Sequence, residues 1–248
     1  RPAAIEAYSN ALKIRRDNHD ARNNLGFVLV EVGQADRALT EFHTVLKDDP
    51  KNIAAIGNIG FALLQRGDMA KAIDQYQAAL RIEPDSAPLH YNLGLAYKQR
   101  DDLEPAKVHL LRAVELDRDL VEAHYTLGIT YWQAGEFAEA EEQMRAATRK
   151  KRDYAAAWTM LGTVQKQQNK TTEALTSLAE AIRLDNESPG PYTLMGQLLR
   201  SQGDIEASNK AFATAARLKA KKEAEQKVMF DRSRTDVVGA AAKPAIKQ

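Results

Sequence analysis

The feature that most constrains this chain is a period of 34 residues, kept without an insertion through most of its 248 residues. One glycine marks the period, at positions Gly26, Gly60, Gly94, Gly128, Gly162 and Gly196. Twelve residues after each glycine stands a second small residue: Ala38, Ala72, Ala106, Ala140, Ala174 and Ser208. Six copies of one short unit predict a stack of like units rather than a single globular core.

Each unit is predicted to be a pair of helices. In the third unit, Leu89, Leu93 and Tyr97 recur at helical spacing, and a turn separates them from a second helical pattern. A glycine inside a helix costs about 1 kcal/mol relative to alanine, so its recurrence indicates that two helix axes approach closely there. One such hairpin cannot bury its apolar face alone, whereas stacked hairpins can. The turn falls seven residues after each glycine, at Gly33, Gly67, Asp101, Gly135, Asn169 and Gly203.

This period and the placement of its small residues resemble the tetratricopeptide repeat family. The resemblance implies an all-α fold, a right-handed α-solenoid of stacked 34-residue helix-turn-helix repeats. Arg22 replaces the large residue that usually stands four before the glycine, which predicts weaker packing in the first repeat. Residues 1–18 match the second helix of a truncated N-terminal repeat, so we expect further sequence upstream of Arg1. The six repeats cover residues 19–222, as 19–52, 53–86, 87–120, 121–154, 155–188 and 189–222.

Beyond residue 222 the repeat pattern fades. Residues 223–248 are interpreted as a polar extension of the last helix, which caps the solenoid, followed from Asp231 by a basic and flexible tail. The net charge is +1, but residues 219–248 carry 8 Lys and Arg against 4 Asp and Glu. The tail is therefore the part expected to meet an acidic surface, while the near-neutral chain argues against nucleic acid as a partner.

Composition narrows the possible chemistry and location. The chain has no cysteine, which excludes disulfides, thiolate metal sites and cysteine nucleophiles. No apolar run reaches the roughly 20 residues that span a bilayer. We therefore expect a soluble protein, in the cytoplasm or exported.

No catalytic, cofactor or metal motif is present. His90 and His124 share one repeat position, four before the glycine, and are interpreted as half-buried residues that pack the two helices of a repeat. Equivalent atoms of successive repeats lie roughly 8–10 Å apart, too far for two imidazoles to share a metal ion. No phosphate-binding loop or nucleophile motif occurs either. We expect no enzymatic activity, no cofactor and no metal.

Each first helix carries a second stripe, formed by the positions six, three and two before the glycine and one, four and five after it. The resemblance implies that this stripe lines a concave groove holding a partner peptide. A side-chain amide both donates and accepts hydrogen bonds, so rows of amides suit peptide groups; the alternative is that they are ordinary residues of an exposed helix surface. The predicted groove residues are Asn24, Asn58, Asn92, Gln65, Gln99, Gln133, Gln167, Tyr91, Tyr125, Trp132, Lys98, Lys166 and Arg200.

The character of this stripe changes along the chain. Phe27 and Phe61 make the first two repeats apolar, the middle repeats are aromatic and the last are basic. An extended ligand with an apolar and an acidic stretch would match. The family's carboxylate clamp needs Lys and Arg near the start of the first helices. Asp20, Ala54 and Pro88 stand there, so binding of chaperone C-termini is not expected.

The leading hypothesis is a non-enzymatic scaffold that binds an extended peptide segment of a partner protein in the groove. One alternative is a structural protein that assembles head-to-tail into oligomers or filaments, through apolar surface around Ile5, Tyr8 and Leu12. Another is the targeting module of a larger enzyme.

Overall fold

The computed structural model describes the backbone of residues 1–241 and the side chains of residues 1–228. Every regular element within these residues is a helix, which confirms the all-α repeat fold. The chain divides into two compact units, Arg1–Lys150 and Lys151–Gln248. The order is α1 (Pro2–Ile14), α2 (His19–Glu31), α3 (Ala35–Asp48), α4 (Ile53–Gln65), α5 (Met69–Ile82), α6 (Ala87–Gln99), α7 (Leu103–Leu116), α8 (Val121–Gln133), α9 (Phe137–Lys150), α10 (Ala155–Gln167), α11 (Thr171–Leu184), α12 (Pro189–Ser201) and α13 (Ile205–Ala241).

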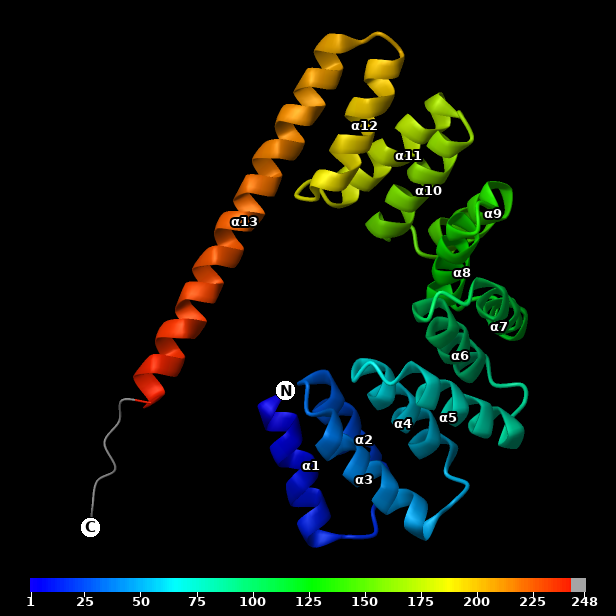
Figure 1. The fold of residues 1–248 in the computed structure, drawn as a ribbon, viewed down its shortest axis with the longest axis vertical. Helices are drawn as coiled ribbons and strands as arrows, with labels where there is room; N and C mark the ends of the chain where they lie inside the picture. The colour runs from blue at the N-terminus through cyan, green and yellow to red at the C-terminus, as the bar shows by residue number, and fades with distance from the viewer. Residues whose placement is uncertain (242–248) are drawn as a thin grey trace. The chain divides into compact units, whose positions relative to one another are not determined.

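The first unit consists of α1 and the hairpins α2–α3, α4–α5, α6–α7 and α8–α9 (Figure 1). Each second helix contacts the first helix of the next hairpin, and the first helices also contact one another. Each first helix begins at the first residue of a predicted repeat: His19, Ile53, Ala87 and Val121. One side of α2, α4, α6 and α8 therefore forms a common face.

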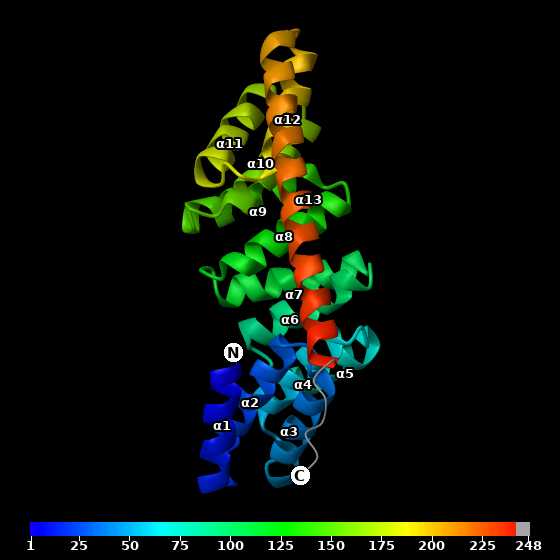
Figure 2. The same cartoon turned by 90° about the vertical axis from the view of Figure 1, so that its left-hand side faces the viewer.

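The second unit consists of the hairpins α10–α11 and α12–α13. Figures 1 and 2 show α13 beside α12 over its first part and continuing past it. Among residues 205–228 of α13, Ala211, Ala215 and Leu218 are the buried apolar residues, whereas the side chains of residues 219–228 are exposed. Residues 219–228 of α13 thus have little apolar packing in this unit.

α13 extends past Asp231, the residue from which a flexible tail was predicted. The helix continues to Ala241, because no proline occurs before Pro244 and alanine, lysine, glutamate and arginine are good helix formers. The remainder of the predicted tail, residues 242–248, lies outside the described residues.

Close contact at the repeat glycine joins the two helices of each hairpin. A Cβ atom at Gly60 would lie 2.7 Å from the Tyr76 ring, and one at Gly26 would lie 2.4 Å from the Phe42 ring. Both distances are shorter than real Cβ contacts, so only glycine fits without a shift. The same clash would occur at the other four glycines, with Leu110, Met144, Leu178 and Phe212.

The turn between the two helices always contains a residue in the left-handed region. At Gly33 (φ 78°) the amide donates to Val30 O, and the next amide, of Gln34, donates to Leu29 O. This pair of bonds is a Schellman motif, which satisfies the last carbonyls of a helix. Asp101 (φ 67°) and Asn169 (φ 59°) adopt the same conformation without the freedom of glycine.

In every repeat but the second, where Ile56 stands, the side chain four positions before the repeat glycine bonds to the loop that precedes its own helix. His90 Nε2–H donates to the carbonyl of Pro84, at 2.9 Å. Since this contact holds the loop between two repeats, it helps to fix how one hairpin follows the next. The same bond, to the carbonyl six residues back, joins His124 to Arg118, Trp158 to Arg152 and Tyr192 to Asn186.

Arg22 occupies this position in the first repeat, and it makes the same kind of contact. Its guanidinium donates to Arg16 O at 2.9 Å and pairs with Glu41 of α3 at 2.7 Å. The sequence reading of Arg22 as a weak point missed these contacts, because they depend on partners that only the folded hairpin brings near.

Candidate functional site

The candidate site lies on the common face of the first helices in the first unit. There α2, α4 and α6 border a pocket of about 580 Å³. Apolar side chains dominate the lining, together with one glycine, two carboxamides, one hydroxyl and one carboxylate. The lining residues are Phe27, Ile53, Ala54, Gly57, Asn58, Phe61, Glu83, Ser86, Pro88, Leu89 and Asn92.

Two of the predicted asparagines line this pocket. Asn58 and Asn92 are half-buried, and their carboxamides make no hydrogen bond within the residues whose side chains the structure describes. Asn24, at the equivalent position of α2, is exposed and does not line it. The structure therefore brings together two of the three asparagines, with donor and acceptor groups both available to a ligand.

An aromatic pair occupies the neighbouring position of the stripe. The rings of Phe27 and Phe61 stack with centroids 5.6 Å apart and planes inclined by 20°. Phe61 is half-buried, but Phe27 remains 42% exposed. An exposed phenylalanine beside an open pocket is apolar surface that a ligand can cover.

The aromatic and basic residues predicted for the middle repeats are half-buried. Tyr91 and Lys98 lie on α6, and Tyr125 and Trp132 lie on α8. Burial lowers the pKa of the Lys98 ammonium, against an opposing effect of Asp101, and burial raises the pKa of the Tyr125 hydroxyl. Trp132 Nε1 is buried and has no hydrogen-bond partner among the described side chains. None of these four residues lines the pocket.

The predicted glutamines are exposed at the ends of their helices and lie outside the pocket. They are Gln65, Gln99 and Gln133 in the first unit and Gln167 in the second. In the second unit the Lys166 ammonium also donates to Gln197 Oε1, and Arg200 is exposed.

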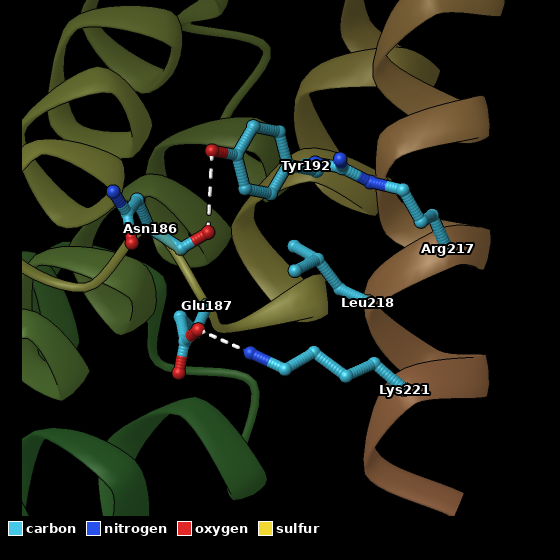
Figure 3. Close-up of a pocket in the computed structure, with 6 residues that line it drawn as sticks. All are labelled: Asn186, Glu187, Tyr192, Arg217, Leu218 and Lys221. Carbon is cyan, nitrogen blue, oxygen red and sulfur yellow. Dashed lines mark hydrogen bonds and ion pairs between the residues drawn. The ribbon is translucent and has the colours of Figure 1, made fainter. Parts of the chain in front are cut away.

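A smaller pocket, of about 330 Å³, lies in the second unit between the loop before α12 and α13 (Figure 3). Lys221 forms an ion pair with Glu187 at 2.5 Å, which raises the pKa of the lysine and lowers that of the carboxyl. Arg217 and Leu218 complete the α13 side. The Glu187–Lys221 ion pair ties the loop to α13, and Arg217 remains as an exposed cationic group at the pocket.

Among the histidines, the structure pairs two that the sequence did not connect. His90 and His109 approach with their Nδ1 atoms 3.0 Å apart. His90 donates from Nε2 to Pro84 O, so its neutral form accepts at Nδ1 and His109 donates. His109 also stacks on Tyr97. His109 stands fifteen residues after the repeat glycine, where hairpin packing rather than repeat identity sets the contact.

In the described part of the chain, no group of three or more His, Cys, Asp or Glu side chains is arranged to hold a metal ion. None of the described helices has the length and hydropathy required to cross a bilayer.

Sequence reasoning missed Gly57, Leu89 and Glu83 as parts of the site. The available signal was a pair of glycines one turn apart in α4, Gly57 and Gly60, of which only Gly60 belongs to the repeat. Leu89 and Glu83 could not be found this way, since they reach the pocket through the stacking of neighbouring hairpins.

Stacked helix hairpins that share an open face of aromatic and amide side chains define an α-helical repeat scaffold. The chain belongs to the tetratricopeptide repeat family. Models of that repeat match residues 2–59, 60–101, 87–120 and 125–189. Proteins of this family are generally non-enzymatic, and the chain is accordingly a scaffold for protein–protein interaction.

Several solved structures are similar. A crystal structure of MamA is 25% identical with a TM-score of 0.64, over 66% of this chain and 96% of that chain. YrrB, described as a TPR protein with an unusual peptide-binding site, is 24% identical with a TM-score of 0.59, over 75% and 96%. The pilF protein of Pseudomonas aeruginosa is 18% identical with a TM-score of 0.73, over 86% and 97%. At such identities the last two show the fold alone. No curated protein matches the chain.

Proposed function

We propose that the chain binds an extended peptide segment of a partner protein on the common face of its first helices. The observation that carries this proposal is the pocket between α2, α4 and α6, with the unpaired carboxamides of Asn58 and Asn92 beside exposed apolar surface. The description of YrrB as peptide-binding is consistent with it.

The two carboxamides would hold the backbone of the bound segment. Each can donate to one carbonyl and accept from one amide, whatever side chains the segment carries. Tyr91, Tyr125 and Trp132 extend apolar surface along the same stripe, and Lys98 adds a half-buried positive charge. Aromatic residues are frequent carriers of binding energy in interfaces. Asn24, Gln65, Gln99 and Gln133 are proposed as weaker, exposed contacts.

Binding of a random-peptide library displayed on phage tests this function. The full chain is compared with the double variant Asn58→Ala and Asn92→Ala. The control is Asn209→Ala with Gln226→Ala, two exposed amides of α13. We expect selected peptides to lose at least about tenfold in affinity for the first variant and to bind the control unchanged. Equal affinity for all three proteins would remove this face as the binding site.

Self-assembly is the second candidate function, because the apolar residues of α1 are incompletely covered. Ile5, Tyr8 and Leu12 are half-buried against the core of the first unit, and Ile14 is 90% exposed. Light scattering at rising concentration, with Ile14→Lys as the variant, tests it. Self-assembly is supported if the molar mass of the parent chain rises with concentration and that of the variant does not. A constant monomer mass for the parent chain excludes it. The targeting-module alternative stays a prediction, which mass spectrometry of the native full-length chain would test.

A further inference from the structure

A second glycine in α4, Gly57, has no close contact that requires glycine among the residues whose side chains the structure describes. A Cβ atom added at Gly57 would meet only Leu89 Cδ2, at the ordinary distance of 3.4 Å. At Gly60, one turn later, the same atom would clash with Tyr76 at 2.7 Å. Since a glycine inside a helix costs about 1 kcal/mol, Gly57 weakens α4 without a compensating internal contact.

What Gly57 does provide is open space on the common face. The equivalent residues in the next two repeats, three positions before the repeat glycine, are Tyr91 and Tyr125, whose half-buried side chains occupy this position on the common face. The missing side chain thus leaves a hollow, and the pocket of about 580 Å³ lies there.

The surroundings of the hollow match a flat apolar group. Phe61 and Phe27 stack beside it with Phe27 partly exposed, and Leu89 and Pro88 also line it. A further ring could extend this stack in the offset arrangement that aromatic pairs prefer.

The only charged residue in the lining is Glu83. It is exposed and forms no ion pair within the residues whose side chains the structure describes. A carboxylate at this site disfavours a negative charge on the ligand and favours a positive one.

Resting on the proposed function, we propose that the hollow over Gly57 receives an aromatic side chain of the bound segment, with a lysine or arginine next to it meeting Glu83. Asn58 and Asn92 then hold the peptide groups on either side. The partner class is an extended segment with an aromatic residue beside a basic one.

Two substitutions at one position separate this proposal from a general effect on stability. Gly57→Ala and Gly57→Leu both remove the cost of a glycine inside the helix, but only the leucine side chain is large enough to fill the hollow. We expect both variants to fold with a melting temperature at or above that of the parent chain. Phage-displayed random peptides selected on the parent chain, then synthesised with both ends capped, serve as the probe.

We expect the selected peptides to share an aromatic residue next to Lys or Arg. Gly57→Leu should weaken their binding at least about tenfold, and Gly57→Ala less than about threefold. Replacing the aromatic residue of the peptide by alanine should weaken binding to the parent chain and add no further loss in Gly57→Leu. Glu83→Gln should reduce the preference for the basic residue.

Selection of aliphatic or acidic peptides, or full binding to Gly57→Leu, overturns the proposal. If Asn58→Ala with Asn92→Ala weakens binding while Gly57→Leu does not, the result supports the peptide-binding function and contradicts the proposal that an aromatic side chain occupies the hollow. If neither change has an effect, or no peptide is selected, both the peptide-binding function and the proposed aromatic pocket are contradicted.

Discussion

At the scale of single residues, several different side chains at one repeat position make the same hydrogen bond. Histidine, tryptophan, tyrosine and arginine, four positions before the repeat glycine, all donate to a carbonyl of the preceding loop. The second repeat has Ile56 at this position, which cannot donate, so the contact occurs in five of the six repeats. In those five, several residue types serve because each carries a donor of sufficient reach. Residue preferences alone therefore do not reveal it.

Tyr76 offers a test at this scale. Its ring is fully buried beneath Gly60, and its hydroxyl has no hydrogen-bond partner among the described residues; burial raises the pKa of this hydroxyl. Phe42 fills the equivalent place in the first repeat. Since an unsatisfied buried hydroxyl costs roughly 1–3 kcal/mol, Tyr76→Phe should raise the free energy of unfolding by about 1 kcal/mol. Urea denaturation measures this, and a loss of stability would contradict it.

The pair of His90 and His109 makes stability depend on pH. Burial, and to a lesser extent the neighbouring His90, lowers the pKa of His109 below its usual 6.5. The unfolded chain then binds more protons near and below pH 6.5, so the stability associated with neutral His109 is present above that pH and is lost as pH falls. Tyr97, Gln77 and Arg81 also border this pair.

The variant His109→Gln tests this dependence. Gln143 stands at the equivalent position of the next repeat, where it bonds to His124 at 2.8 Å, so glutamine fits there. We expect urea midpoints of the parent chain to fall between pH 7.5 and pH 5.5 more steeply than those of the variant. Parallel curves for the two proteins would mean that His109 is not responsible.

At the scale of the helix and the turn, a positive φ angle ends each first helix. Asp101 and Asn169 carry it where the other repeats have glycine. Asp101→Gly and Asn169→Gly should each stabilise the protein by about 0.5–1 kcal/mol, because a left-handed conformation is less costly for glycine. Asp101 should give the larger effect, since its carboxylate lies at the negative end of α6. Thermal unfolding measures both, with Gly67→Ala as the destabilised control.

The turn also illustrates how much of the elements was predictable. The spacing located all six turn residues and the start of each first helix, since helical periodicity and turn chemistry are local properties. The continuation of α13 past Asp231 was not predicted, because polar helix without apolar periodicity looks like a tail. In the candidate site, Asn58 and Asn92 were identified, but the hollow between them was not.

At the scale of the whole molecule, each stacked repeat contacts only its neighbours, so its stability depends on the interfaces with the repeats beside it. Gly60→Ala should destabilise the first unit by about 1–3 kcal/mol through overpacking against Tyr76. Hydrogen exchange should show the largest loss of protection in α4 and α5, less in α2, α3, α6 and α7, and least in α8 and α9. Gly57→Ala is the matched control and should show no loss. Uniform loss across the first unit would indicate a single cooperative core.

The sequence by itself determined the family, the helix hairpins, the turns and the stripe on which ligands are expected to bind. These follow from a strict 34-residue period, and periodicity depends only on residues close together in the chain. Only the tertiary structure decided which stripe residues meet. It brought Asn58, Asn92, Phe27 and Glu83 around Gly57, left the glutamines apart and paired His90 with His109. The physical reason is that a pocket or a contact pair arises from the packing of neighbouring helices. The distance between two packed helices cannot be predicted from the sequence pattern of either helix alone.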